Sequence, residues 1–78
     1  MDKKYWANIT SKILRTEMTK RGMKYDVLVE KLAEIGVSLT ADDLRARVSR
    51  GNFSAALFVQ CLRAMGVKNL PFDDSYFE

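Results

Sequence analysis

Arginine is concentrated in one short stretch of the chain, at Arg45, Arg47 and Arg50. A guanidinium group donates paired hydrogen bonds to guanine in the major groove, worth about 1–3 kcal/mol of discrimination, and it also binds phosphate. On a helix, Arg45 and Arg47 are about 200° apart, so they cannot both point at one groove floor. At least one of them is expected to be solvated or to pair with Asp42 or Asp43.

The chain offers little for catalysis or metal binding. It has no His and a single cysteine, Cys61, so neither a zinc site nor an internal disulfide is expected. No Ser, Cys or Asp lies in a motif with an activating base, and there is no Gly-rich phosphate loop. Cys61 lies in the most apolar stretch, which predicts a buried structural thiol. We therefore expect no enzyme, no cofactor and no small-molecule ligand.

Charge is unevenly distributed along the 78 residues. The net charge is +3, but residues 1–70 contain all 13 Lys and Arg and seven of the acids, whereas residues 71–78 add three more acids. The sequence therefore predicts one basic domain, residues 1–72, followed by an acidic-aromatic tail, residues 73–78. A basic surface favours phosphate backbones, and the alternative is that the cations are simply solvated on helix surfaces.

Helices must position these side chains, because Gly and Pro occur only between long periodic segments. The sequence predicts an all-α fold, a small bundle of four to five helices. The predicted helices span residues 5 or 8 to 21, 24 or 25 to 35, 41–50, and 54–65. The third is expected to have Thr40 as N-cap, with Asp43 three residues on, and to end at Gly51. Residues 67–72 are expected to pack back in extended form, and residues 73–78 to form a loose tail.

The apolar residues predict which helix faces are buried. The first helix carries a stripe that includes Trp6, the second a stripe that ends at Ile35, and the third has two large inward residues, Leu44 and Val48. The full first stripe is Trp6, Ile9, Ile13, Leu14 and Met18. The fourth helix, capped by Ser54 or Asn52, is apolar nearly all round. It is therefore either central to the core or half buried in a partner.

Four segments carry a resemblance to a known family. They are Lys20-Arg21-Gly22-Met23-Lys24-Tyr25, Leu28-Val29-Glu30-Lys31-Leu32, Ser49-Arg50-Gly51 and Leu62-Arg63-Ala64-Met65-Gly66-Val67. In this order, over about residues 12–72, the chain resembles the repressor-like (Cro and lambda-repressor, XRE-type) helix-turn-helix family. It is also similar to a group of short bacterial proteins of uncharacterised function, which keep a Trp near the start and a Ser-Arg-Gly-Asn-Phe-Ser run.

The repressor-like resemblance implies a transcriptional regulator that binds double-stranded DNA as a homodimer, with half-sites roughly 34 Å apart. It implies that Tyr25 touches phosphate, that Thr40 and Ala41 begin the recognition helix, and that outward residues of that helix read bases. The implied DNA-binding residues are Lys24, Tyr25, Thr40, Ala41, Arg45, Arg47, Arg50 and Asn52. The fourth helix, or the segment 71–77, is the expected pairing surface.

The alternative is a protein-interaction module on the same fold without DNA binding. Its support is Asp42 and Asp43 at the start of the third helix, and a stretch from Gly36 to Gly51 about three residues longer than the family pattern. A third feature that favours it is the aromatic-acidic tail 71–78, as a segment that docks on a partner. The N-terminus has no apolar signal core, and no apolar run approaches membrane-spanning length. A soluble cytoplasmic protein without membrane contact is therefore expected.

Overall fold

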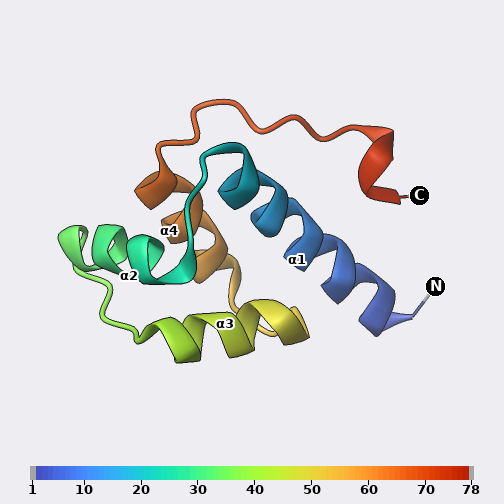
Figure 1. Ribbon diagram of the computed structural model, residues 1–78. Coiled ribbons are helices and arrows are strands. Elements are labelled where there is room, and N and C mark those ends of the chain that lie inside the picture. Colours follow the sequence, from blue (N-terminus) through green and yellow to red (C-terminus); the bar gives the residue numbers. More distant parts are fainter. Residues whose placement is uncertain (1, 78) are drawn as a thin grey trace.

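The computed structural model describes residues 2–77, which form helices joined by loops (Figure 1). Met1 and Glu78, which the predicted ranges 1–72 and 73–78 include, lie outside the described residues. The elements are α1 (Lys3–Lys20), α2 (Tyr25–Glu34), α3 (Ala41–Arg50), α4 (Ala55–Met65) and a 3-10 helix, η1 (Asp74–Phe77). No strand occurs between residues 2 and 77. The predicted all-α fold, a small bundle of four to five helices, is confirmed.

Three of the four α-helices, α1, α3 and α4, begin where a side chain accepts a hydrogen bond from the first turn. Thr40 accepts from the Asp43 backbone N–H at 3.0 Å, and Ser54 accepts from the Leu57 N–H at 3.0 Å, so both predicted caps are confirmed. The predicted start of α1 is wrong by at least two residues, because Asp2 accepts from the Tyr5 N–H at 2.9 Å and starts the helix at Lys3. Each of the four helices is followed within two residues by a glycine with positive φ.

All four α-helices contribute to one apolar core. Its buried side chains are Leu14, Met18, Leu28, Leu32, Leu44, Val48, Leu57, Cys61 and Met65. The predicted burial of Cys61 is confirmed, and that burial raises the pKa of its thiol to about 11. The opposite side of α4 is open, with Val59 61% exposed. One side of α4 therefore lies in the core, which was one of the two predicted alternatives, and its other side is exposed.

Two predicted core residues are on the surface instead. Trp6 is 52% exposed and Ile35 is 45% exposed. Ile35 lies beyond the end of α2 as its C-cap, so the helical stripe that predicted its burial has already ended. Trp6 lies in the first turns of α1 and packs on Phe77 of the C-terminal segment, outside the apolar core.

The crossing of α1 over α3 depends on small side chains. A Cβ added to Gly51 would lie 2.3 Å from the carbonyl oxygen of Ala7. Gly51 also has φ of +64°, where a side chain is strained. One turn along α1, the buried Ser11 hydroxyl donates to the backbone carbonyl of Val48. The two helix backbones are thus in near contact, and this fixes the end of α3 against α1.

The C-terminal segment packs on the other side of α1. The predicted loose tail, residues 73–78, is wrong for its described part, because η1 buries Tyr76 to 4% exposure against Ile9 and Ile13. The Lys12 ammonium also donates to the carbonyl of Ser75 at 3.3 Å. Burial of the Tyr76 ring and the Lys12 contact therefore hold on α1 a segment that also carries Asp73 and Asp74. In Figure 1 this segment and α3 lie on opposite sides of α1.

A buried carboxylate, that of Glu17, lies in the last turn of α1. Glu17 is 1% exposed, and its two oxygens pair with Arg21 at 2.7 Å and Lys20 at 3.1 Å. Burial alone would raise the pKa of Glu17, but the hydrogen bonds and positive charges of Arg21 and Lys20 outweigh it and hold the pKa below its ordinary value of 4.5. Lys20 and Arg21 therefore neutralise a negative charge in the protein interior.

None of the helices between residues 2 and 77 has both the length and the apolar composition needed to cross a bilayer.

Candidate nucleic-acid interface

The connection between α2 and α3 is longer than a tight turn. Six residues, 35–40, separate the two helices. Gly36 takes positive φ directly after α2, so the additional residues lie in the connection and not in an extra turn of α2. The inward positions of α3 are Leu44 and Val48, both fully buried as predicted. The polar and charged side chains of α3 are exposed, whereas Ala41 and Ala46 are half-buried.

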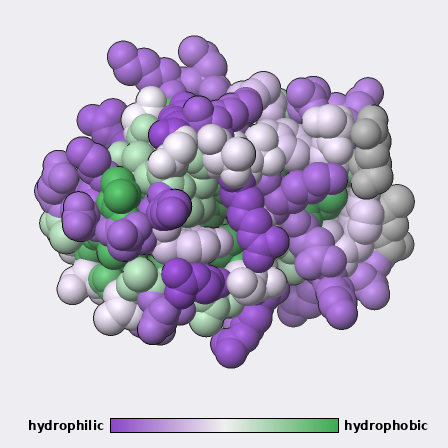
Figure 2. All heavy atoms as spheres, viewed as in Figure 1, coloured by the Kyte–Doolittle hydropathy of each residue, from purple (hydrophilic) through white to green (hydrophobic). Residues whose placement is uncertain are grey.

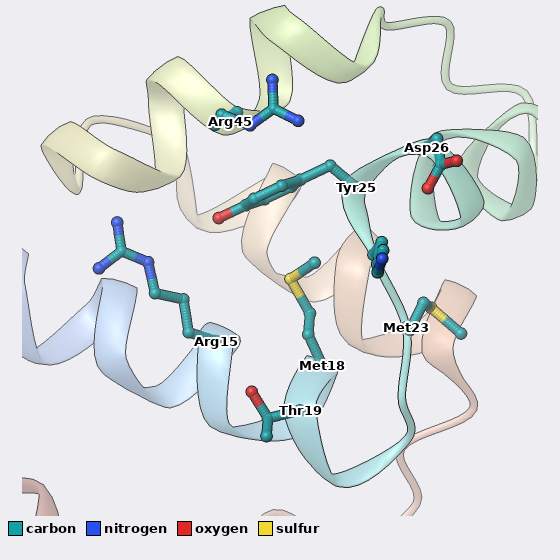
Figure 3. Close-up of a pocket in the computed structure, with 8 residues that line it drawn as sticks. Arg15, Met18, Thr19, Met23, Tyr25, Asp26 and Arg45 are labelled. Atoms are coloured by element: carbon teal, nitrogen blue, oxygen red, sulfur yellow. The ribbon is translucent and has the colours of Figure 1, made fainter.

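A surface hollow of about 630 Å³ lies where α1, α2 and α3 meet (Figure 3). Its lining residues are Arg15, Met18, Thr19, Met23, Lys24, Tyr25, Asp26 and Arg45. Figure 3 shows the Tyr25 ring extending from the start of α2 between α3 and α1, with Arg45 on one side and Met18 on the other. Three cations and one acid thus surround an apolar floor. Such a hollow suits an anion that carries an apolar edge.

Arg45 is held in place by two contacts. Its Nη1 atom donates to the Asp42 carboxylate at 2.7 Å, and its guanidinium lies 5.2 Å from the centre of the Tyr25 ring. The expectation that one arginine of α3 pairs with Asp42 or Asp43 is therefore confirmed for Arg45. The Arg45 side chain remains 54% exposed, so its other guanidinium nitrogens are open to a ligand.

The N-terminus of α2 opens beside this hollow. Lys24 is its N-cap residue and makes no side-chain capping hydrogen bond. The Asp26 carboxylate accepts instead from the next backbone N–H, that of Val27, at 2.9 Å. The first turn of a helix carries N–H groups without intrahelical partners and a partial positive charge. The cations of the hollow therefore lie beside backbone groups that also attract an anion.

A second hollow, of about 570 Å³, lies where the start of α1 meets the end of α3. Its lining residues are Lys3, Lys4, Ala7, Asn8, Ser49, Arg50, Gly51 and Asn52. Arg50 and Asn52 were predicted from the sequence, whereas Lys3, Lys4 and Asn8 were missed. The Lys-Lys pair is visible in the sequence, but only the crossing of α1 over α3 brings it beside Arg50.

Arg15 connects the two hollows. It lines the first hollow, and its Nη2 atom donates to the Ser49 hydroxyl, which lines the second, at 3.3 Å. We use "basic face" for the cations that line the two hollows, Lys3, Lys4, Arg15, Lys24, Arg45 and Arg50. Asp26 lines the first hollow beside these cations, and Asp42 pairs with Arg45. The basic face therefore keeps a clear excess of positive charge along the α1 side of α3.

Three predicted site residues lie outside both hollows. Thr40 is exposed and caps α3, Ala41 is half-buried behind it, and Arg47 is exposed. Arg47 follows Arg45 by two positions and so lies on the opposite flank of α3. Among residues 2–77 it forms no ion pair. The eight predicted residues are thus divided between the two hollows, the start of α3 and its far flank.

The surface seen in Figure 2 is mainly hydrophilic, with hydrophobic side chains in separate small areas. A polar surface with concentrated cations is typical of proteins that bind phosphate backbones.

Comparison with known proteins identifies a matching family, and this family has no assigned activity. The model of the domain of unknown function DUF6471 matches residues 6–70. No curated protein and no solved structure matches the chain.

Proposed function

This chain belongs to the DUF6471 family, and we propose that it is a repressor-like helix-turn-helix protein that binds double-stranded DNA. The observation that carries the proposal is the basic face, in which α1, the start of α2 and α3 bring six cations along one side of a single exposed helix. A transcriptional regulator that acts on the bacterial chromosome from the cytoplasm is the role that fits such a surface.

In the proposed complex α3 lies in the major groove, and the start of α2 lies at a phosphate. Lys24 and Tyr25 meet the phosphate beside the uncapped end of α2, as the N-termini of helices do in this class. Arg15 and Arg45, which border the same hollow, supply further positive charge. The second hollow lies farther along the same side of α3. The cations of the two hollows therefore follow one strand of the duplex.

The acids of α3 are compatible with this orientation. Asp42 faces Arg45 at 2.7 Å, so its charge is offset within the protein before DNA is present. Asp43 donates its backbone N–H to the cap residue Thr40 and lies in the first turn, where an acid suits the helix dipole. Both acids have a structural role at the start of α3. Base contacts are accordingly assigned to the middle and far end of the helix, where Arg47 is exposed and forms no ion pair among residues 2–77.

The test is a fluorescence-anisotropy titration of a random-sequence duplex at 50 mM and 200 mM salt. We expect log affinity to fall with log salt by about 0.9 for each phosphate neutralised. The variant Arg15→Gln, Arg50→Gln removes two cations of the basic face and should weaken binding strongly. Its control, Arg63→Gln, Lys68→Gln, removes the same charge from exposed positions elsewhere. Equal weakening by both variants, or no binding of the wild type at 50 mM salt, would refute the proposal.

A protein-interaction module is the second candidate. The exposed acids Asp42 and Asp43 and the six-residue connection 35–40 favour it, because neither feature helps a helix enter a groove. Capture from nuclease-treated lysate should then recover a stoichiometric protein partner, which Asp42→Asn, Asp43→Asn loses and which salt scarcely affects. If the captured material is nucleic acid and disappears with nuclease, this candidate fails.

A further inference from the structure

The first hollow has an apolar floor that a phosphate backbone does not need. Met18 is 5% exposed and belongs to the apolar core, and the half-buried Met23 packs against that core. In Figure 3 the Met18 side chain reaches up beneath the Tyr25 ring. Methionine side chains adapt to the shape of a bound group and make favourable contacts with aromatic rings. The proposed contacts of Lys24 and Tyr25 with a phosphate leave this floor unused.

The rim of the same hollow carries more positive than negative charge. Arg15 lies on α1, Lys24 precedes α2 and Arg45 lies on α3, so the fold gathers cations that are distant in the sequence. Arg45 pairs with Asp42, whereas Arg15 and Lys24 form no ion pair among residues 2–77. The acid that lines the hollow, Asp26, accepts a hydrogen bond from its own helix. The charges of Arg15 and Lys24 are therefore available to an anion.

The second hollow offers cations without such a floor, since Ala7 is the largest apolar residue of its lining. The volumes of the two hollows are similar, at about 630 and 570 Å³. Small-molecule sites commonly have volumes of roughly 300–1,000 Å³. The two hollows therefore differ in chemistry more than in size. Of the two, the first suits a ligand that has both an anionic group and a flat apolar body.

We propose that the first hollow binds a small aromatic phosphate monoester. The aromatic ring of the ligand rests on Met18 and Met23, and its phosphate lies between Arg15 and Lys24. Charge-assisted hydrogen bonds from a guanidinium and an ammonium group hold a phosphate more strongly than neutral donors do. The ring supplies the apolar contacts that a bare phosphate lacks.

Tyr25 forms a wall of this site and not a stacking platform. Its ring has the Arg45 guanidinium on one face, 5.2 Å from the ring centre, and Met18 on the other (Figure 3). Both faces of the ring are thus occupied within the protein. Figure 3 shows the Tyr25 hydroxyl pointing toward the side of the hollow where Arg15 lies. A phenolic hydroxyl in this position can donate a hydrogen bond to the bound phosphate.

Occupation of the first hollow would regulate DNA binding. The proposed complex uses Arg15, Lys24 and Tyr25 at the phosphate backbone, so the ligand and the duplex compete for the same groups. Each should lower the apparent affinity for the other. This regulation rests on the proposed function, whereas binding of the ligand itself does not. The two are therefore measured separately.

The test of the site is an NMR titration of the isotope-labelled protein with naphthyl phosphate, without DNA. For a ligand of this size we expect a dissociation constant on the order of 0.1–1 mM. The backbone amide signals of Lys24 and Tyr25 should shift and saturate with this constant. Inorganic phosphate and naphthol each carry one half of the chemistry, and each should bind at least about tenfold more weakly.

Variants of exposed residues locate the ligand. Arg15→Gln with Lys24→Gln should weaken binding of naphthyl phosphate at least about tenfold. The matched control, Lys3→Gln with Arg50→Gln, removes the same charge from the second hollow and should leave the affinity within about twofold. Asp26→Asn removes the acid of the first hollow and should raise the affinity by about twofold. This single change covers the case in which the first double variant disturbs the fold.

The test of the regulation is displacement of the random-sequence duplex at low salt. Naphthyl phosphate should displace it near its own dissociation constant, and inorganic phosphate at equal ionic strength should not. The site is refuted if naphthyl phosphate binds no more tightly than inorganic phosphate, or if both double variants weaken its binding equally. Unchanged duplex affinity with the hollow saturated would refute the regulation. A protein that binds naphthyl phosphate but no duplex would keep the site and refute the proposed function.

Discussion

The two faces of α3 differ in how closely they are packed and in how far they are exposed to solvent. On the inner face, Gly51 leaves no space for a Cβ beside the Ala7 carbonyl, and Ser11 uses its hydroxyl on the backbone of Val48. On the outer face, Asp42 and Arg45 are exposed, and their contact at 2.7 Å is surrounded by water. The inner face permits almost no change in volume, whereas the outer face permits many changes in charge.

The two faces of α3 are expected to affect different properties: the inner face the stability of the fold, and the outer face the affinity for a ligand. Contacts that exclude water contribute strongly to the free energy of unfolding, while exposed ion pairs contribute about 0–1 kcal/mol. Substitutions on the inner face should therefore alter stability, and substitutions on the outer face should alter affinity for a ligand with the fold intact. A variant that does the reverse would show that the two faces are not independent.

The largest effect is expected from Gly51→Ala. The added Cβ would lie 2.3 Å from the Ala7 carbonyl oxygen, and the residue would keep φ near +64°. Strain and displacement of α1 together should lower the free energy of unfolding by about 3 kcal/mol or more, measured by urea denaturation. The control is Gly66→Ala, where φ is +77° but no atom lies within 4 Å, and about 1 kcal/mol is expected. If both variants lost the same free energy of unfolding, α1 and α3 would have room for a Cβ at Gly51.

The next effect is expected from Glu17→Gln. This change leaves Arg21 and Lys20 without the buried carboxylate that they share, at a cost of about 1–3 kcal/mol in unfolding free energy. Asp42→Asn is the matched control, because its pair has the same 2.7 Å distance but is exposed, and less than about 1 kcal/mol is expected. If Asp42→Asn lowered the free energy of unfolding as much as Glu17→Gln does, burial of the carboxylate would not be what makes the Glu17 pairs stabilising.

Stability should also depend on acid through Glu17. Its pKa is below 4.5 in the folded protein, so the stabilisation is present above the unfolded pKa and is lost as pH falls through the folded pKa. Urea denaturation at pH 7 and at pH 3 should therefore show a loss that is smaller in Glu17→Gln. The same loss in both proteins would assign the acid sensitivity to other carboxylates.

Several helix ends could be predicted from the sequence, because they depend on local chemistry, although the start of α1 at Lys3 was not. Thr40 and Ser54 cap their helices as predicted, and Gly51 ends α3 as predicted. The stripe of α3 likewise placed Leu44 and Val48 in the core. Each of these predictions uses side chains within one or two turns of each other, where helical geometry alone determines the outcome.

Contacts between distant segments could not be predicted in the same way. The second hollow requires Lys3 and Lys4 to meet Arg50, and nothing in either segment specifies the crossing angle of α1 over α3. Trp6 and Tyr76 show the same limit, since both are aromatic and only the fold determines that Tyr76 is buried and Trp6 is not. The i,i+4 spacing of an ion pair is visible in a sequence, but the burial of the pair is not.

On the outer face, Arg50→Gln should weaken duplex binding without a change in stability. If Arg50 neutralises one phosphate in the second hollow, the slope of log affinity against log salt should fall by about 0.9. Arg63→Gln, an exposed arginine of α4, should leave the slope unchanged. Anisotropy titrations at several salt concentrations measure both. A reduced slope in the control alone would place the DNA on α4.

The smallest effect is a gain of affinity in Asp42→Asn. This change removes a negative charge from the proposed interface and releases the Arg45 guanidinium, which Asp42 now holds at 2.7 Å. Exposed pairs of this kind contribute about 0.3–0.5 kcal/mol, so duplex affinity should rise by a factor of about two at 50 mM salt. The gain should shrink in an Arg45→Gln background, because the released group is then absent. If Asp42→Asn weakened binding instead, Asp42 would be accepting a hydrogen bond from a base, and the start of α3 would belong to the reading surface.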